Sequence, residues 1–133
     1  MPEKIYLSVK GVGVDLIRIN RVAGVYRRRP ERFLKRIFTE KEISLLLKRN
    51  NPVSSIASRF AAKEAVSKAL GCGIGAVQWR DIEILADARG KPEVYLQGEA
   101  ARWAGSHGIT GVLVSMSHDT PFALAEAIAY GNR

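Results

Sequence analysis

An alanine-rich, helix-forming segment at residues 59–70 carries one carboxylate among several basic side chains. On a helix, Glu64 and Lys68 are i, i+4 neighbours, and Arg59 and Lys63 form a second such row beside them. Many segments of this kind are solvent-exposed faces, in which a Glu–Lys pair contributes only about 0.3–0.5 kcal/mol. The alternative is an anion site, where a carboxylate holds a hard metal ion while the basic side chains bind phosphate. The segment alone favours the first interpretation.

A second isolated acid, Asp15, interrupts the apolar, strand-like run at residues 9–17. The same run contains Gly11 and Gly13, and glycine inside a strand usually marks a bulge or the close approach of another backbone. A lone carboxylate in apolar surroundings is unfavourable unless a charged group pairs with it. Asp15 could instead cap a following helix. No spacing rule brings Asp15 and Glu64 together.

The composition is typical of a single soluble globular domain. The chain has 133 residues, of which 47% are hydrophobic and 26% charged, enough for one core but not for two. It contains no apolar run of transmembrane length and no signal-peptide pattern, so we expect no association with membranes. A single cysteine, Cys72, excludes an internal disulfide and suggests a reducing, cytoplasmic location.

The net charge of +8 is concentrated near the N-terminus, where residues 18–36 include eight arginines or lysines and one acid. We expect a helix at residues 16–29, with apolar residues on one face and Arg18, Arg21 and Arg28 on another. Nucleic acid is the default partner of such a helix. A second candidate is an acidic protein, whose encounter and orientation the charges would promote. A merely solvated face is the third and least attractive interpretation of so uneven a cluster.

The predicted elements place most helices early and most antiparallel strands late. The expected strands are at 5–15, 81–85, 93–96, 111–117 and 121–130, and the expected helices are at 16–29, 39–49, 51–70 and 98–107. Thr39 and Glu42 have capping-box spacing, Asn51 precedes a proline suited to a first helical turn, and Gly71 suits a left-handed helix end. The order predicts an α+β fold in one small domain, with the early helices packed on an antiparallel sheet.

A glycine-rich loop at residues 71–75 has the appearance of a nucleotide-binding pattern. It follows a helix and not a strand, so a dinucleotide-binding fold is excluded. Because Gly71 and Gly73 lack side chains, a phosphate or adenine could approach their backbone N–H groups closely. A flexible loop is the simpler interpretation. His118, in a turn expected at 118–120, is on its own best interpreted as a structural residue.

Taken together, the motifs resemble the holo-acyl-carrier-protein synthase family, which are small 4′-phosphopantetheinyl transferases. They occur in family order as GVGVD at 11–15, FTEKE at 38–42, RFAAKE at 59–64, KALG at 68–71, GKP at 90–92 and VSMSH at 114–118. The resemblance extends from about Val9 to Tyr130 and leaves residues 1–8 as an N-terminal extension.

The resemblance implies transfer of the 4′-phosphopantetheine arm of coenzyme A to a serine of apo acyl carrier protein, in fatty-acid biosynthesis. Adenosine 3′,5′-bisphosphate would be the leaving group. Asp15, Glu64 and Lys68 would be catalytic, with the two acids binding Mg²⁺ and the lysine neutralising the pyrophosphate. Coenzyme A would contact Arg59, Lys63, Gly71, Gly73, Pro92, Ser115 and His118. Either a metal-bound water near Asp15 or Glu64 itself would accept the serine proton.

The family also implies a homotrimer with active sites between subunits, and Arg59 or His118 would then act across an interface. Arg18, Arg21 and Arg28 would dock the acidic carrier protein. The alternative function is a small basic nucleic-acid-binding module without catalytic activity. No known nucleic-acid motif is present and the aromatic residues are not interleaved with the basic ones, so we expect no nucleic-acid partner.

Overall fold

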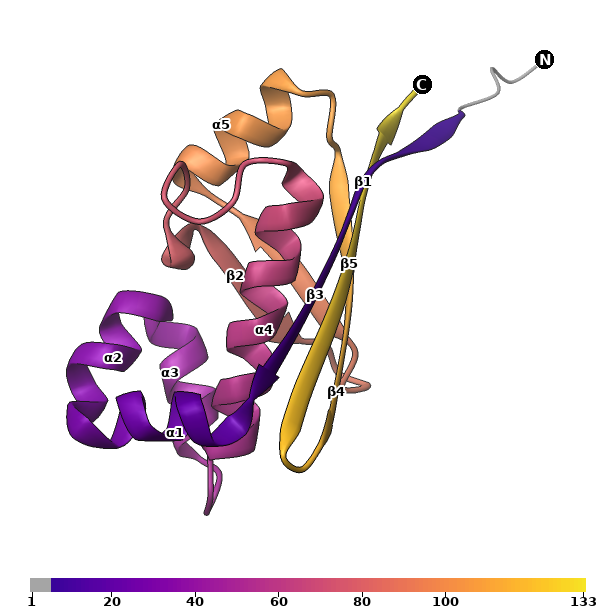
Figure 1. The fold of residues 1–133 in the computed structure, drawn as a ribbon. Helices are drawn as coiled ribbons and strands as arrows, with labels where there is room; N and C mark the ends of the chain where they lie inside the picture. The colour runs from indigo at the N-terminus through magenta and orange to yellow at the C-terminus, as the bar shows by residue number, and fades with distance from the viewer. Residues whose placement is uncertain (1–5) are drawn as a thin grey trace.

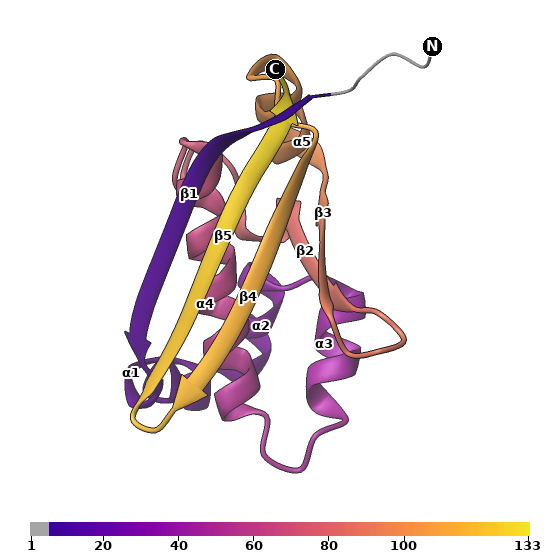
Figure 2. The same ribbon diagram turned by 90° about the vertical axis from the view of Figure 1, so that its right-hand side faces the viewer.

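A long central helix, α4 (Val53–Leu70), lies between two antiparallel sheets in this computed structural model, which describes residues 6–133 (Figure 1). One sheet has three strands in the order β1–β5–β4, and the other is a hairpin of β2 and β3. The strands are β1 (Leu7–Arg18), β2 (Ile82–Ala86), β3 (Pro92–Leu96), β4 (Gly111–Asp119) and β5 (Phe122–Asn132). Figure 2 shows that none of the helices within residues 6–133 covers the outer face of the three-stranded sheet.

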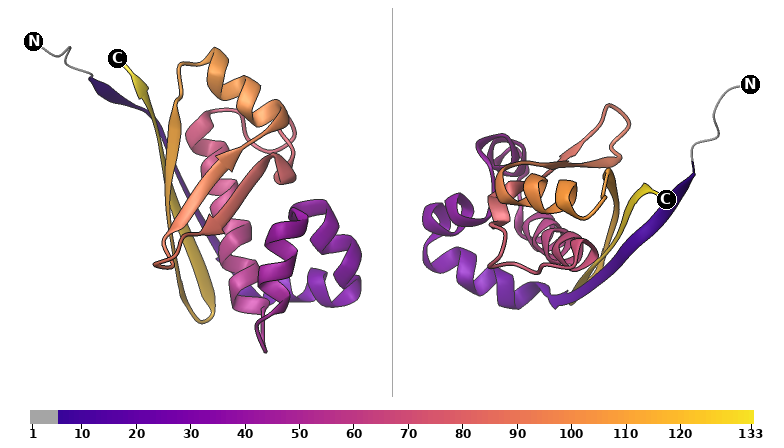
Figure 3. Two further views of the ribbon diagram at one scale, coloured as in Figure 1. Left: turned by 180° about the vertical axis from the view of Figure 1, so that it is seen from behind. Right: turned by 90° about the horizontal axis from the view of Figure 1, so that it is seen from above.

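The other helices gather at the two ends of α4 (Figure 3). Near its N-terminal end lie α1 (Ile19–Arg28), α2 (Pro30–Ile37) and α3 (Glu40–Leu47), and near its C-terminal end lies α5 (Gly98–Ser106). A short 3₁₀ helix, Trp79–Asp81, precedes β2. Within residues 6–133, none of the helices has the length and apolarity needed to cross a lipid bilayer.

The contact between α4 and the three-stranded sheet is built from very small residues. The β5 residues that face α4 are all buried alanines, at 123, 125, 127 and 129, and α4 presents Ala61, Ala65 and Ala69. A side chain at Gly11 or Gly13 of β1 would overlap the backbone carbonyl oxygens of Ala69 or Ala65. The predicted close approach of another backbone to these glycines is therefore confirmed, and a register shift follows Val9.

The predicted α+β class is confirmed, although α1 packs more on α4 than on the sheet. The capping box of Thr39 and Glu42 forms as predicted, and Gly71 ends α4 with a φ of 88°. The side chain of Asn51 accepts a hydrogen bond from the N–H of Val53 at 3.4 Å, but Pro52 lies just before the helix and not in its first turn.

Two predicted strands end too early, because both pair with β5 as far as its first residue, Phe122, and one helix was not predicted. β1 continues to Arg18, which pairs with Phe122, so Asp15 lies within a strand and does not cap a helix. β4 continues to Asp119, so His118 lies in that strand and not in a turn. Pro30 does more than end α1, because it also begins the unpredicted helix α2.

The N-terminal extension predicted at residues 1–8 is only partly within the described structure. Residues 1–5 lie outside the described residues. Leu7 and Ser8 pair with Asn132 and Gly131, so they belong to β1.

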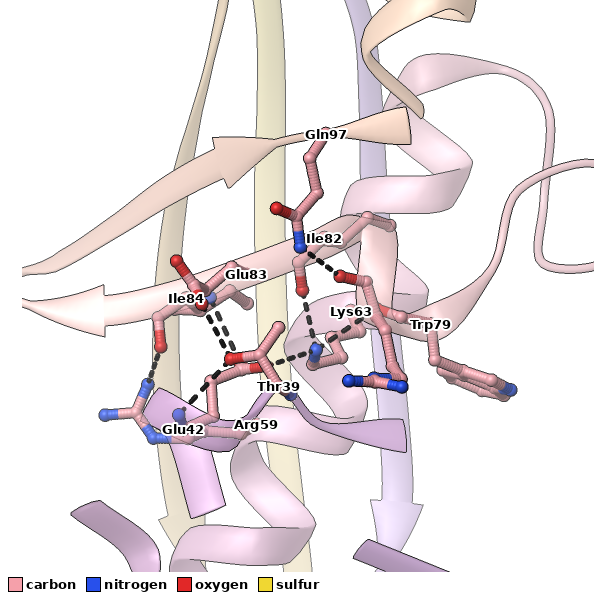
Figure 4. Close-up of polar contacts among 10 residues, drawn as sticks. Thr39, Glu42, Arg59, Lys63, Trp79, Ile82, Glu83, Ile84 and Gln97 are labelled. Carbon is pink, nitrogen blue, oxygen red and sulfur yellow. Dashed lines mark hydrogen bonds and ion pairs between the residues drawn. The ribbon is translucent and has the colours of Figure 1, made fainter. Parts of the chain in front are cut away.

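Charged side chains satisfy the edge of β2 that does not pair with β3 (Figure 4). The carbonyl of Ile82 accepts a hydrogen bond from Nζ of Lys63 at 2.6 Å, and the N–H of Ile84 donates to Oε2 of Glu42 at 3.1 Å. The carbonyl of Ile84 accepts from Nη1 of Arg59 at 3.1 Å. Side chains from α3 and α4 thus take the place of a neighbouring strand.

Glu42 and Lys63 also form an ion pair at 2.8 Å, and both side chains are completely buried. We expect Glu42→Gln, which leaves the Lys63 ammonium without a counter-charge, to lower the free energy of unfolding by about 3–5 kcal/mol. Lys63→Met should have a similar effect. In the double variant no buried charge is left unpaired, so its loss should be smaller than the sum of the two. Denaturant unfolding of the three variants measures this coupling, and additive losses would contradict it.

Candidate active site

Asp15 of β1 and two residues of α4, Glu64 and Lys68, meet where the strand crosses the helix. Nζ of Lys68 donates to Oδ1 of Asp15 at 3.3 Å and to the carbonyl of Val14 at 3.0 Å. Glu64 precedes Lys68 by one helical turn, and its carboxylate is close enough to Asp15 to be repelled by it. The two isolated acids, which no spacing rule connects, therefore share one site.

The electrostatics of this site are unfavourable without a further cation. Burial raises the pKa of Glu64, the negative charge of Asp15 raises it further, and Lys68 only partly opposes them. Oδ2 of Asp15 is buried and has no hydrogen-bond partner. Two converging carboxylates, one with an unpartnered buried oxygen, are a donor set that suits a hard divalent cation. No cluster of three or more potential His, Cys, Asp or Glu ligands occurs in residues 6–133, so this site offers two protein carboxylates.

Lys63 lies outside this site, and its ammonium has no free donor for the predicted contact with a coenzyme A phosphate. Its Nζ donates to Glu42 at 2.8 Å, to the carbonyl of Trp79 at 3.1 Å and to that of Ile82 at 2.6 Å. All three ammonium N–H groups are used, so none is left for a phosphate. Burial lowers the pKa of Lys63, and Glu42 opposes this shift. Arg59 also turns toward β2, and burial is the main cause of its lowered pKa.

Most backbone N–H groups of the glycine loop already have acceptors within the chain. The N–H groups of Gly71, Cys72 and Gly73 all donate to the carbonyl of Ser67, at 3.2, 3.3 and 3.2 Å. The idea that these N–H groups bind phosphate is therefore not supported. A side chain added at Gly71 or Gly73 would meet no atom within 4 Å, so the loop leaves open space that a ligand could contact.

The remaining predicted contacts do not come together within one chain. In β4, Ser115 lies opposite Glu126 on the face of the sheet that points away from α4. His118, three residues along the strand, lies opposite the buried Ala123 and so belongs to the other face. Pro92 begins β3, in the other sheet. Ser115 and His118 therefore point to opposite faces of one strand.

The predicted docking face is divided between two elements. Arg18 ends β1, with its guanidinium 5.2 Å from the ring centroid of Phe122, so it does not share the face of α1 that carries Arg21 and Arg28. An apolar groove of about 410 Å³ lies beside Arg21. A second groove, of about 270 Å³, lies beside Arg28.

Sequence reasoning missed the floor of these grooves because it did not predict α2. Phe33 of α2 lines both grooves, and its ring stacks on Phe60 with centroids 6.4 Å apart. Phe60 in turn stacks on Trp79 at 4.7 Å. The signal that could have predicted α2 is Pro30, a residue suited to a first helical turn, followed by Phe33 and Arg36 at helical spacing.

The comparisons with known proteins identify the class to which this fold and site belong. Residues 11–125 match the 4′-phosphopantetheinyl transferase superfamily, and the chain belongs to that family. It is 46% identical to the holo-[acyl-carrier-protein] synthase of Natranaerobius thermophilus, over 92% of this chain and 98% of that protein. It is 48% identical to the synthase of Chlamydia trachomatis, over 90% and 98% of the two chains.

Solved structures of holo-[acyl-carrier-protein] synthases have the same fold as this chain. The crystal structure of the Neisseria meningitidis holo-[acyl-carrier-protein] synthase matches with a TM-score of 0.84 and 37% identity, over 92% of this chain and 98% of that one. The Helicobacter pylori synthase in complex with coenzyme A matches with a TM-score of 0.79 and 34% identity, over 89% and 98%.

We expect Glu64→Gln to stabilise the metal-free protein at neutral pH. Because the folded pKa of Glu64 is raised, its ionised form destabilises the folded state above that pKa. The stability gained by the variant should shrink as the pH falls through the folded pKa, and vanish below the ordinary value of 4.5. Thermal melts of both proteins over this pH range measure the difference. Glu99→Gln is the control, because that exposed carboxylate pairs with Arg102 and its pKa is lowered. Equal melting temperatures for wild type and Glu64→Gln at neutral pH would contradict the expectation.

Proposed function

We propose that this chain transfers the 4′-phosphopantetheine group of coenzyme A to a serine of apo acyl carrier protein, with Asp15, Glu64 and Lys68 at the reacting centre. The reaction class follows from the family and from relatives that match over nearly the whole chain. The assignment of residues rests on one observation, the convergence of the three side chains around an unpartnered oxygen of Asp15. Nothing in these comparisons supports the nucleic-acid-binding alternative.

Asp15 and Glu64 would hold Mg²⁺, an ion that accepts one or two carboxylates and takes its other ligands from water and substrate phosphates. When bound, Mg²⁺ supplies neutralisation of the charge that develops on the pyrophosphate oxygens. Oδ2 of Asp15 is the natural first ligand because no protein group occupies it. Glu64 would be the second, and a cation there would relieve its repulsion by Asp15.

Lys68 differs from Lys63 in having donor capacity left. Its Nζ donates to Val14 and Asp15, which uses two of three ammonium N–H groups, and the side chain is 51% exposed. The third N–H can donate to a phosphate oxygen beside the two carboxylates. Such fixed charge, aimed at the phosphates, is the main source of rate in phosphoryl transfer.

The outer face of the three-stranded sheet supports a homotrimer as part of the proposal. Large apolar side chains of β1, β4 and β5 are exposed on this face. Val12, Val14, Leu16, Leu113 and Leu124 are each 42–67% exposed on this face. Contiguous exposed apolar surface of this kind marks protein interfaces. Association through it would bring Ser115 of one subunit toward another subunit.

A subunit interface would explain why the coenzyme A contacts are scattered within one chain. Gly71, Gly73, Pro92, Ser115, His118 and the rest of the Arg59 guanidinium stay in the proposal as contacts of the nucleotide and the pantetheine arm. Lys63 does not, because it has no free donor. A cytoplasmic location, suggested by the single cysteine, is also part of the proposal.

We expect Asp15→Ala and Glu64→Ala each to fold and to lose transfer activity by about a thousandfold or more. The reason is the loss of several kcal/mol of charge neutralisation in the transition state. Mass spectrometry of apo carrier protein, incubated with coenzyme A and Mg²⁺, measures the transfer. Glu99→Gln, an exposed acid on α5, should transfer at the normal rate. Near-normal activity of either alanine variant at limiting Mg²⁺ would overturn the assignment.

We expect the double reversal Arg21→Glu/Arg28→Glu to raise the KM for the carrier protein and to leave the KM for coenzyme A unchanged. Each exposed contact is worth only about 0.5–1 kcal/mol, so two changes are needed for a clear effect. Higher salt should screen these charges and so reduce the difference in the KM for the carrier protein between wild type and the double variant. The matched control is Arg89→Glu, an exposed arginine in the turn between β2 and β3.

Nucleic acid tests the alternative function for the same surface. Duplex DNA or tRNA at physiological salt should neither slow transfer nor displace the carrier protein. Strong displacement together with an absence of transfer would favour the nucleic-acid-binding module.

A further inference from the structure

We propose that the buried pair Glu42–Lys63 is a positioning pair for the active site. By holding α3 and β2 against one side of α4, it fixes the rotation of α4 that turns Glu64 toward Asp15. The inference rests on the proposed metal site and goes beyond it, because neither Glu42 nor Lys63 touches substrate or metal. Both act through Glu64, the residue next to Lys63 in the chain.

The directions of three consecutive residues on α4 show how this works. Successive residues of a helix point about 100° apart. Lys63 points toward β2, where it donates to Ile82, and Ala65 points toward β1, where its backbone lies against Gly13. Glu64 lies between these two directions, at the seam where Asp15 is found. Its position therefore depends on the rotation of the helix.

On the sheet side of α4, interdigitation of side chains contributes little to that rotation. The contacts there are made by alanines and glycines, such as Ala65 and Ala69 against Gly11 and Gly13. Side chains this small do not interdigitate, so the surface is smooth. On that side Lys68 of α4 makes directional contacts with Val14 and Asp15. On the opposite side Lys63 and Arg59 make four more.

The polar network on the β2 side is closed and fully satisfied (Figure 4). Oε1 of Glu42 accepts from Lys63 and from the N–H of Thr39, at 2.8 and 2.9 Å, and Oε2 accepts from Ile84. The hydroxyl of Thr39 accepts from the N–H of Glu42 at 3.3 Å and donates to Glu83 at 2.6 Å. Turning α4 would break the bonds that Lys63 makes to Glu42, Trp79 and Ile82, and the bond that Arg59 makes to Ile84. Buried charges would then be left unsatisfied.

A small rotation is enough to matter. Side chains lie about 5–6 Å from a helix axis, so a turn of about 20° moves a carboxylate by about 2 Å. Metal–ligand distances tolerate only about 0.2 Å. Loss of the pair should therefore weaken cation binding even where the protein remains folded.

The test compares the double variant Glu42→Gln/Lys63→Met with Leu46→Ala, which opens a cavity in the buried core at α3 without touching the polar network. Two quantities are measured: the Mg²⁺ concentration for half-maximal transfer, and the binding of Mn²⁺ to the free protein by electron paramagnetic resonance. Both should shift by about tenfold or more in the double variant, as when groups that orient metal ligands are removed. Leu46→Ala should leave both unchanged, and the KM for the carrier protein should be unchanged in both variants.

An unchanged Mg²⁺ requirement in the folded double variant would overturn the proposal, as would an equal shift in Leu46→Ala. If the double variant fails to fold, Thr39→Val carries the same readouts, because it removes the hydroxyl that holds Glu83 and the N–H of Glu42. An unchanged Mg²⁺ requirement in Thr39→Val would likewise overturn the proposal. Mn²⁺ binding that survives Asp15→Ala would overturn the metal site itself, and with it this inference.

Discussion

The close approach of α4 to β1 is the constraint on which the rest of the structure depends. Short side chains of a helix and of a strand can contact one another only if the two backbones lie very close together. Gly11 and Gly13 make this possible, because a methyl group at either would overlap a carbonyl oxygen of α4. Two residues beyond this contact, Asp15 reaches Lys68 with a short acidic side chain. A larger residue at Gly13 would move the helix away and leave the carboxylates apart.

Two lysines of one helix show how surroundings, and not residue type, assign a role. Lys63 has three acceptors within reach, so its ammonium is saturated inside the protein. Lys68 has two, and its side chain extends to solvent, so it keeps a donor for a ligand. The buried lysine holds two layers of the fold together, and the exposed one faces the chemistry. Their spacing of five residues directs them to different sides of α4.

Features that depend on local chemistry could be predicted from the sequence. The Thr39–Glu42 capping box, the left-handed Gly71 and the close packing at Gly11 and Gly13 all follow from residue type and short spacing. The pairing of Asp15 with Glu64 came from family resemblance, because no local rule connects residues so far apart. The role of Lys63 could not be predicted, since helical spacing says which residues share a face but not what covers it. The free edge of β2 that attracts Lys63 exists only in the folded chain. The opposite facing of Ser115 and His118 was hidden by the early end assigned to their strand.

The way β2 is closed also bears on how the protein avoids misassembly. An unpaired strand edge is a template on which another chain can add a strand, the first step toward aggregates. At β2 that template is blocked, because carboxylate, ammonium and guanidinium groups already bond the carbonyl and N–H groups of Ile82 and Ile84 that β3 leaves unpaired. An incoming strand would have to displace buried charges and leave them unpaired, which is strongly unfavourable. The β2 edge of the hairpin is therefore closed to the addition of another strand.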